Sequence, residues 1–193
     1  DTLIPRPDSE ILVESAIEFI NEKPFQNLKI LDLGVGSGCL LVSLLKELQD
    51  AEGFGLDQSS AALVVARRNA VRHGVSERAC FVAGSWGEPL DCLFDVIVVN
   101  PPYIAFSERL DLEPEILDYE PSKALFAGVS NDLMYRELAP HLVRLLSPNG
   151  QVFVELGLGL GAKVKTLLET SGLVEIDRRC DLSGIERCGI YAF

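Results

Sequence analysis

The sequence predicts an open α/β protein in which helices cover both faces of a seven-stranded, mostly parallel sheet. Two observations support this prediction. Short apolar runs alternate with segments that carry helical periodicity, which is typical of parallel strands joined by crossover helices. The last two apolar runs are separated only by residues 181–186, too few for a crossover helix, so these strands should pair antiparallel.

The individual elements follow from local patterns along the chain. Apolar residues at helical spacing predict a first helix over residues 9–20. Two further helices are expected over residues 40–48 and 61–73, the second ending at His73 and Gly74 as a C-terminal cap. Strands are expected over residues 28–33, 53–57, 79–83, 94–99, 151–156, 173–179 and 187–193.

Bulk properties limit the function classes. The 193 residues suffice for one well-buried domain over 1–193, and 48% hydrophobic and 24% charged residues describe an ordinary globular protein. No apolar run approaches the roughly 20 residues that span a bilayer. A net charge of −12 argues against a broad phosphate-binding face. Five cysteines without a C-x-x-C pair, with only two histidines, predict no metal site and reduced thiols in a cytoplasmic setting.

A glycine-rich turn follows the first expected strand. The segment Asp32-Leu33-Gly34-Val35-Gly36-Ser37-Gly38 joins that strand to the helix over 40–48, an arrangement that brings backbone N–H groups close to a ligand. Its spacing departs from the dinucleotide fingerprint G-x-G-x-x-G, because Gly38 comes one position early. Asp32 would repel a pyrophosphate and attract a cationic amine. The turn therefore favours a nucleoside that carries an amino acid.

Asp57 ends the second expected strand, nineteen residues after Gly38. An acidic residue at this position is placed to accept hydrogen bonds from both ribose hydroxyls. The alternative is a helix N-cap, but Ser59 can supply that cap for the helix over 61–73. An amino acid, a ribose, an adenine and a methyl-bearing sulfonium occur together in S-adenosylmethionine, which we therefore expect as the cofactor.

The segment Asn100-Pro101-Pro102-Tyr103 follows the buried run 94–99. A residue before proline is driven into an extended conformation, and neither proline offers a competing backbone donor. The Asn100 side-chain oxygen and the Pro101 carbonyl could then face one point, beside the flat ring of Tyr103. Two acceptors beside a flat wall suit a planar –NH2 group, although a plain loop start is the structural alternative.

Residues 105–129 form the one long connection that we expect to be irregular. They contain six carboxylates, two prolines and the stretch Tyr119-Glu120-Pro121. Such long loops are uncommon unless they are functional or disordered. We interpret this segment as a flap over the acceptor site.

With these motifs placed, the chain resembles the HemK/PrmC family of release-factor glutamine methyltransferases over its full length. The most specific matches are Ile4-Pro5-Arg6-Pro7-Asp8-Ser9-Glu10 and Tyr119-Glu120-Pro121, whereas the glycine turn is shared by many unrelated enzymes. Further matches are the Asn-Pro-Pro-Tyr segment, 124–125, 135–136, 155–157, 181–184 and Arg187.

The resemblance implies a class I, Rossmann-like methyltransferase sheet with strand order 3-2-1-4-5-7-6. It assigns Gly34–Gly38 and Asp57 to S-adenosylmethionine, and Trp86 to the neighbourhood of the adenine, although Trp86 could instead fill the core. Ser85 stands where the family often has Asp, which would weaken a hydrogen bond to the adenine amino group. The family also carries an N-terminal helical domain that this chain lacks, so the chain is expected to be the catalytic domain.

The resemblance further implies that Asn100, Pro101, Pro102 and Tyr103 bind the substrate glutamine, with Asn100 also next to the cofactor. Asn100, Pro101 and Tyr103 are the expected catalytic residues, because two acceptors would orient a weakly nucleophilic amide nitrogen toward the methyl group. The substrate would be a glutamine in the Gly-Gly-Gln motif of a class I peptide chain release factor. Glu155 is a candidate for the proton's exit or, more simply, for a structural hydrogen bond.

Three alternatives stay open at this point. An N6-adenine DNA or RNA methyltransferase also accepts a planar –NH2 group, but it would need base flipping and basic backbone contacts. A ribosomal-protein glutamine methyltransferase and a non-catalytic scaffold that binds S-adenosylmethionine are the other two. Arg6 is expected either to hold a carboxylate near the flap or to pair at the surface.

Overall fold

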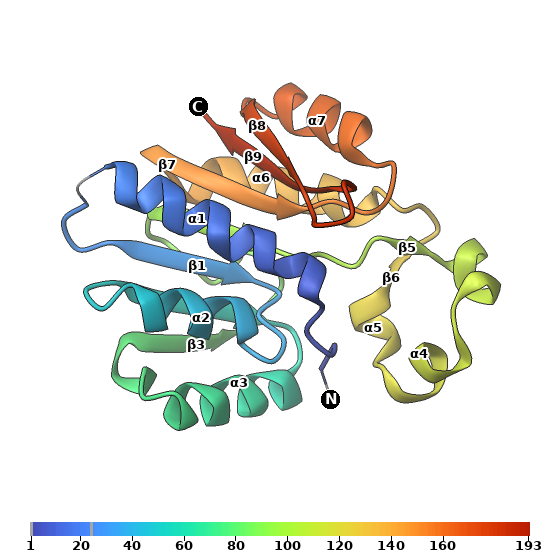
Figure 1. Cartoon of the computed structure of the whole chain (residues 1–193), viewed down its shortest axis with the longest axis horizontal. Helices are drawn as coiled ribbons and strands as arrows, with labels where there is room; N and C mark the ends of the chain where they lie inside the picture. Colours follow the sequence, from blue (N-terminus) through green and yellow to red (C-terminus); the bar gives the residue numbers. More distant parts are fainter. Residues whose placement is uncertain (1, 24) are drawn as a thin grey trace.

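The computed structural model describes residues 2–23 and 25–193. Its main sheet has the order β3-β2-β1-β4-β7-β9-β8, and β9 runs antiparallel to both neighbours while the other pairs are parallel (Figure 1). Numbered within this sheet, the order is 3-2-1-4-5-7-6, so the predicted order and antiparallel last pair are confirmed. The strands are β1 (Lys29–Leu33), β2 (Glu52–Asp57), β3 (Ala79–Ala83), β4 (Phe94–Val99), β7 (Leu146–Glu155), β8 (Val174–Cys180) and β9 (Glu186–Ala192).

The strand bounds agree with the predicted ones to within one residue, except for the start of β7. That strand begins at Leu146 rather than at residue 151. Leu146 pairs with Phe94, and regular pairing resumes at Gln151 opposite Val96 after a register shift. The apolar run that begins at 151 therefore predicts the regular part of β7 and misses the part before the irregularity.

Helices cover both faces of the sheet through two separate apolar cores. Along β4, Val96 and Val98 belong to the core under α1 to α3, whereas Ile97 and Val99 belong to the core under α6 and α7. Burial of each such side chain stabilises the fold by about 1.5–3 kcal/mol. No helix of the described residues has the length and apolar content to cross a membrane. The helices that cover the sheet are α1 (Glu10–Glu22), α2 (Cys39–Glu47), α3 (Ser60–Arg72), α6 (Leu133–Leu145) and α7 (Gly161–Thr170). Two short 3-10 helices accompany them: η1 (Pro7–Ser9) precedes α1, and η2 (Ser76–Arg78) precedes β3.

The connection between β4 and α6 forms a lobe beyond the carboxyl ends of the parallel strands (Figure 1). It contains β5 (Ile104–Ala105), η3 (Phe106–Asp111), α4 (Pro114–Tyr119), α5 (Ser122–Leu125) and β6 (Phe126–Gly128), and we call it the flap lobe. The strands β5 and β6 pair in a second, two-stranded sheet.

The prediction that residues 105–129 are irregular is therefore wrong. Pro114 occupies the first turn of α4, where its fixed φ favours a helix and its missing N–H costs nothing. The Ala105 N–H donates to Glu108 Oε2 at 2.7 Å, and the rings of Phe106 and Phe126 lie 5.3 Å apart. These short-range contacts order a segment whose composition alone suggests a loop.

Candidate active site

The glycine turn between β1 and α2 has the backbone geometry that its sequence suggests. Gly34, Gly36 and Gly38 all have positive φ, of 77°, 52° and 79°. Such angles favour glycine over any residue with a Cβ atom. At Gly38 an added Cβ would also lie 3.2 Å from the Cβ of Ala66, so α2 and α3 approach closely there. The turn thereby exposes backbone at the N-terminus of α2, without side chains in the way.

Asp32 lies buried at the base of this turn, on the penultimate residue of β1. It is 2% exposed, and its Oδ2 atom has no hydrogen-bond partner. Burial raises the pKa of the Asp32 carboxyl from 3.8 to about 7, the Leu41 N–H opposes this shift, and the charge of Asp57 adds to it. A buried, unpartnered carboxylate oxygen is costly and gains most from a cationic partner. Asp32 therefore suits a ligand ammonium group.

Asp57 connects the end of β2 to the glycine turn. Its Oδ2 accepts a hydrogen bond from the Gly36 N–H at 2.9 Å, and its Oδ1 accepts one from the Ser59 N–H at 2.8 Å. Ser59 is the N-cap of α3, because its Oγ accepts from the Ala62 N–H at 3.2 Å. Each Asp57 oxygen keeps a second lone pair, so the carboxylate can still accept from two ligand hydroxyls.

Trp86 and Ser85 follow β3 on the same side of the sheet. Trp86 is 8% exposed, belongs to the core that contains Leu33 and Leu56, and donates from Nε1 to Glu137 Oε2 at 3.1 Å. Its φ of 43° is unusual for a bulky residue and marks a constrained turn. The structure thus makes Trp86 largely a core side chain, while Ser85 is half-buried beside it.

The Asn100-Pro101-Pro102-Tyr103 segment begins directly after the last residue of β4 and joins it to β5 without helix or strand structure of its own. Its prolines favour an extended backbone at the residues before them. Asn100 Nδ2 donates to Ser9 Oγ at 3.2 Å, so this hydrogen bond does not use the Asn100 side-chain oxygen. The Tyr103 ring packs over the backbone after β7, where a Cβ added to Gly157 would lie only 2.9 Å from the ring. Gly157 is therefore needed for the position of Tyr103.

Glu155, the last residue of β7, accepts hydrogen bonds at the centre of this region. Ser9 Oγ donates to its Oε2, and the Tyr103 hydroxyl lies 3.4 Å from its Oε1. Glu155 is 2% exposed, and burial raises the pKa of its carboxyl while contacts with Ser9 and Arg187 oppose the shift. Burial and the Glu155 charge also raise the pKa of Tyr103 to about 12, so Tyr103 stays a neutral donor.

Arg6 and Glu120 join the N-terminal segment to the flap lobe. Arg6 forms an ion pair with Glu120 Oε1, and Glu120 is 8% exposed with its Oε2 buried and unpartnered. Of the two interpretations offered by the sequence, the structure supports the one in which Arg6 holds a carboxylate of the flap. Because only the Glu120 side of this pair is buried, the pair fixes the position of the flap lobe more than it adds stability.

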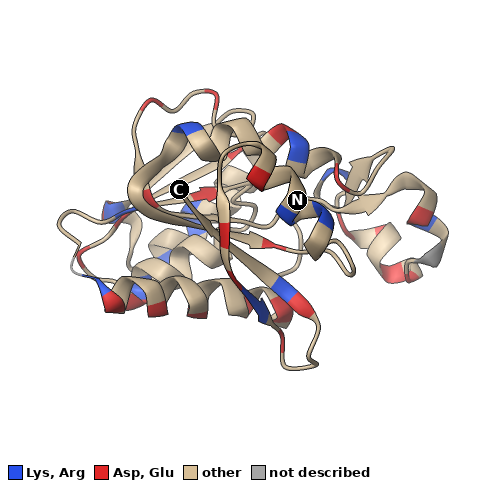
Figure 2. Ribbon diagram, turned by 90° about the horizontal axis from the view of Figure 1, so that it is seen from above, with Lys and Arg blue, Asp and Glu red and all other residues tan. Residues whose placement is uncertain are grey.

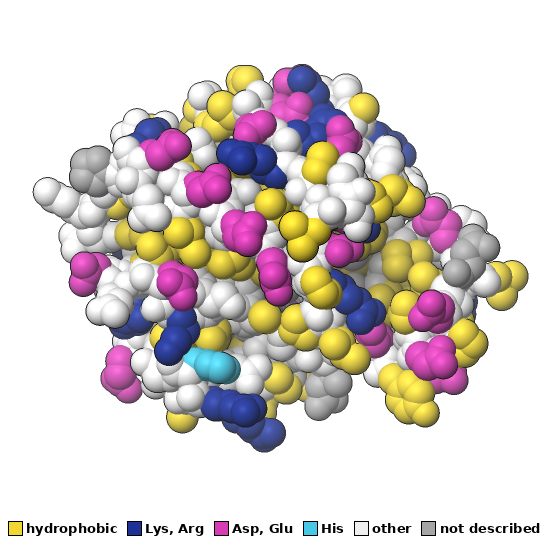
Figure 3. Space-filling view, viewed as in Figure 1, with side chains coloured by type: hydrophobic (Ala, Val, Ile, Leu, Met, Phe, Trp, Pro, Cys, Tyr) yellow, Lys and Arg dark blue, Asp and Glu magenta, His cyan; other side chains and the backbone are white. Residues whose placement is uncertain are grey.

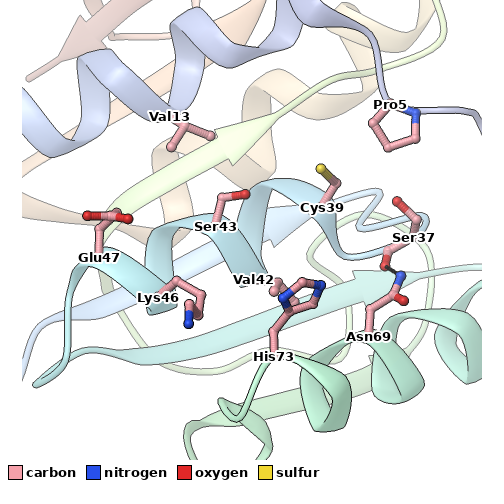
Figure 4. Close-up of a pocket in the computed structure, with 10 residues that line it drawn as sticks. All are labelled: Pro5, Val13, Ser37, Cys39, Val42, Ser43, Lys46, Glu47, Asn69 and His73. Atoms are coloured by element: carbon pink, nitrogen blue, oxygen red, sulfur yellow. Dashed lines mark hydrogen bonds between the residues drawn. The ribbon is translucent and has the colours of Figure 1, made fainter.

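A cavity of about 510 Å³ lies beside the glycine turn, between α2 and the C-terminal half of α3 (Figure 4). Its lining includes Ser37, Cys39, Asn69 and His73, and Asn69 Nδ2 donates to the Ser37 carbonyl at 2.8 Å. His73 is the C-cap of α3, as predicted. Neither Asp57 nor Asn100 lines this cavity, which shares only Ser37 of the glycine turn with the candidate site.

Sequence reasoning missed Ser9 and Gly157 as parts of this region. Ser9 lies within the matched segment 4–10, but nothing local indicates that its hydroxyl reaches two strand ends. Gly157 could have been found as a glycine directly after a predicted strand. No group of three or more metal-ligating side chains occurs among the described residues.

Residues 24–169 match the family model of a methyltransferase domain, so the chain belongs to this family. The release factor glutamine methyltransferase of Rhodospirillum rubrum is 44% identical over 97% of this chain and 57% of its own length. The chain spans between 57% and 66% of the length of the curated relatives of that name that it matches. The resemblance predicted from the sequence is thereby confirmed.

Two solved structures show the same fold. The hMettl16 catalytic domain in complex with the MAT2A 3′UTR hairpin 6 has a TM-score of 0.75 and 16% identity, covering 100% of this chain and 73% of that one. The glycopeptide N-methyltransferase MtfA complexed with S-adenosyl-L-methionine has a TM-score of 0.65 and 16% identity, covering 94% and 93%. At these identities the likeness shows the fold alone. The family model and the fold together confirm the prediction of a methyltransferase domain with this α/β fold.

Proposed function

We propose that this chain transfers a methyl group from S-adenosylmethionine to the side-chain amide nitrogen of a glutamine in a class I peptide chain release factor. The observation that carries the proposal is the Asn100 amide, whose Nδ2 is bonded to Ser9 and whose oxygen stays available at the end of β4. The similarity to curated release factor glutamine methyltransferases supports the choice of acceptor.

Residues at the ends of β1 and β2 would hold the cofactor. The unpartnered Asp32 oxygen would meet its ammonium group, the backbone of 34–38 would face its amino-acid part, and Asp57 would accept from the ribose hydroxyls. Trp86 and Ser85 would lie near the adenine, and the limited exposure of Trp86 leaves little of its side chain for that contact. When bound, S-adenosylmethionine supplies an electrophilic methyl group on sulfur.

Residues after β4 would bind the acceptor. An amide nitrogen is a weak nucleophile because its lone pair is delocalised into the carbonyl. The Asn100 side-chain oxygen and the Pro101 carbonyl would accept its two N–H groups, and Pro102 and Tyr103 would form an apolar wall beside the amide. These acceptors also stabilise the positive charge that develops on nitrogen, so no side chain needs to remove a proton before transfer.

An N6-adenine methyltransferase is the main alternative. The net charge is −12, and in the view of Figure 2 Lys and Arg are interspersed with Asp and Glu rather than gathered in one band. A nucleic-acid substrate requires several phosphate contacts from basic residues. We therefore propose a protein acceptor, without direct nucleic-acid binding, that is methylated in the cytoplasm.

The flap lobe supports a protein partner of complementary charge. Its surface combines carboxylates with exposed apolar side chains, including Phe106, Leu110 and Tyr119 (Figure 3). We propose that residues 1–193 are one catalytic domain and that the flap lobe covers the acceptor segment during transfer.

Methyl transfer to defined acceptors tests the proposed function. The chain would be incubated with labelled S-adenosylmethionine and one of three acceptors: a release factor with an intact Gly-Gly-Gln motif, the same factor with that glutamine replaced by leucine, or duplex DNA. We expect the label on the glutamine side chain of the intact factor only, located by mass spectrometry. Label on adenine, or equal label on both release factors, would contradict the proposal.

A further inference from the structure

Three side chains from distant segments form one hydrogen-bonded chain behind the acceptor segment. Asn100 Nδ2 donates to Ser9 Oγ at 3.2 Å, and Ser9 Oγ donates to Glu155 Oε2. Ser9 is 7% exposed and Glu155 is 2% exposed, so water does not compete freely for either contact. The Tyr103 hydroxyl shares the same carboxylate through Oε1.

The donors and acceptors of the three side chains set the direction of these hydrogen bonds. An ionised carboxylate only accepts hydrogen bonds, and a serine hydroxyl has a single proton to donate. Ser9 must therefore give its proton to Glu155 and use a lone pair to accept from Asn100. Asn100 can satisfy that lone pair only with its –NH2 group, so its Oδ1 atom points away from Ser9.

We propose that Ser9 and Glu155 are positioning residues that fix the flip of the Asn100 side-chain amide. This inference rests on the proposed function, because the fixed oxygen serves an acceptor –NH2 group. With the opposite flip, Asn100 would present its own –NH2 to that group, and two donors would face each other. Ser9 and Glu155 thus select the productive one of two amide orientations that have nearly the same shape.

The surroundings of Glu155 determine its protonation state, and with it the direction of the hydrogen bonds from Asn100 through Ser9 to Glu155. Asp8, Tyr103, Tyr135, Cys188 and Arg187 are the titratable groups that interact with this carboxyl. Burial raises its pKa, whereas the Ser9 and Tyr103 hydroxyls and the Arg187 charge favour the ionised form. A protonated Glu155 could donate to Ser9, which would then donate to Asn100 Oδ1 and reverse the flip.

Nuclear magnetic resonance of the chain labelled with ¹⁵N-asparagine tests the flip without any substrate. The Asn100→Ala variant assigns the signal. We expect one Asn100 side-chain hydrogen to exchange with solvent about tenfold faster in Ser9→Ala, and Ser9→Thr, which keeps the hydroxyl, to restore slow exchange. Unchanged exchange in Ser9→Ala, with the fold intact by circular dichroism, would overturn the proposal whatever the chain methylates.

A kinetic cycle then tests the effect on transfer. At saturating S-adenosylmethionine, Ser9→Ala should lower the single-turnover rate on a release factor about tenfold, with cofactor affinity unchanged and Ser9→Thr near the parental rate. In the Asn100→Ala background, Ser9→Ala should cause no further loss, because Ser9 acts only through Asn100. An equal loss in both backgrounds would show a merely structural role and overturn the proposal.

The pH profile of the rate separates positioning from packing. The parental rate at saturating cofactor should fall at acid pH as Glu155 protonates. Ser9→Ala should lack this fall, because without the Ser9 hydroxyl the protonation of Glu155 cannot reverse the hydrogen bond to Asn100. As a matched control, Ser171→Ala removes a partly buried hydroxyl that donates to the Leu167 carbonyl on α7, and should keep both rate and profile.

A parental chain inactive on every release factor would contradict the proposed function, whereas the exchange experiment would still decide the flip. An acid fall retained in Ser9→Ala would contradict the role of Glu155.

Discussion

The two halves of the candidate site are assembled in different ways. In the cofactor half, Asp57 bonds to Ser59 and Gly36, which are 2 and 21 residues away in the sequence. In the acceptor half, Ser9 bonds to Asn100 and Glu155, which are 91 and 146 residues away. A local strand–turn–helix unit can thus form the first half, whereas the second needs α1, β4 and β7 already packed together. Changes in the two halves should therefore affect different quantities: cofactor affinity in one, and transfer rate in the other.

The largest effect should come from the acceptor half. Asn100→Ala should lower the methyl-transfer rate by about 10²–10³, the size typical for loss of one preorganised polar partner. The fold and the cofactor affinity should stay nearly unchanged, because Asn100 follows the end of β4 and only its amide group disappears. Single-turnover kinetics with a release factor, together with calorimetry of S-adenosylmethionine binding, measure the two quantities.

The matched control for this change is Asn21→Ala, which removes an exposed asparagine near the end of α1. It should leave both the rate and the affinity at the parental values. If Asn100→Ala methylates the release-factor glutamine at the parental rate, Asn100 does not belong to the acceptor site. If it instead weakens cofactor binding as strongly as it slows transfer, the division into two halves is wrong.

The next effect should come from the cofactor half. Asp57→Ala should weaken S-adenosylmethionine binding by about 1–3 kcal/mol, because charge-assisted bonds to the ribose hydroxyls are lost. The variant also removes the acceptor of the Gly36 N–H, so the glycine turn loses one of its anchors. Calorimetry measures the change, and the transfer rate at saturating cofactor should fall much less.

Two variants calibrate this result. Asp57→Glu keeps two acceptor oxygens but misplaces them, so its loss should be smaller than that of Asp57→Ala. Asp50→Ala removes an exposed carboxylate before β2 and should leave the affinity unchanged. Equal affinities for the parental chain and Asp57→Ala would remove Asp57 from the cofactor pocket.

The contrast between the halves also explains what the sequence could predict. The positions of Gly34–Gly38, Asp57 and Ser59 follow from local spacing, because positive φ angles and a helix cap leave recognisable residues. The order of the seven strands came from the family resemblance, and the antiparallel last pair from the short connection between its two strands. These predictions are confirmed by the sheet.

Other features had no local signal. The position of Ser9 between Asn100 and Glu155 depends on how α1 crosses the ends of β4 and β7, and periodicity says nothing about that crossing. The flap lobe was predicted as irregular because its helices are short and its two strands have two and three residues. Elements this short leave too few residues for a periodic pattern to emerge.

A third effect, again in the cofactor half, is a pH dependence of binding. Burial raises the pKa of Asp32 to about 7, so the carboxyl is neutral below that pH and anionic above it. A cationic ammonium group binds the anion, so S-adenosylmethionine affinity should rise about tenfold from pH 6 to pH 8 and level off beyond. Titration calorimetry across this range measures it.

Asp32→Asn is the control for this dependence. It keeps the shape of the side chain but cannot ionise, so its affinity should be low and flat between pH 6 and pH 8. A parental affinity that does not change with pH would show that Asp32 does not meet the ammonium group. The acid fall expected for the acceptor half differs in kind, because it lowers the rate at saturating cofactor.

The smallest effect concerns the far end of the cofactor half, where this chain departs from the family pattern. Ser85→Asp should tighten S-adenosylmethionine binding by about 1 kcal/mol if a carboxylate there accepts from the adenine amino group. Ser85 is half-buried beside Trp86, so the cost of desolvating the new charge reduces the gain. A comparison between S-adenosylmethionine and its inosine analogue, which has no amino group, tests the cause: the gain should appear for the first and vanish for the second. Equal improvement for both nucleosides would mean that the introduced carboxylate acts by charge or by turn geometry, and the adenine would then not be recognised at this position.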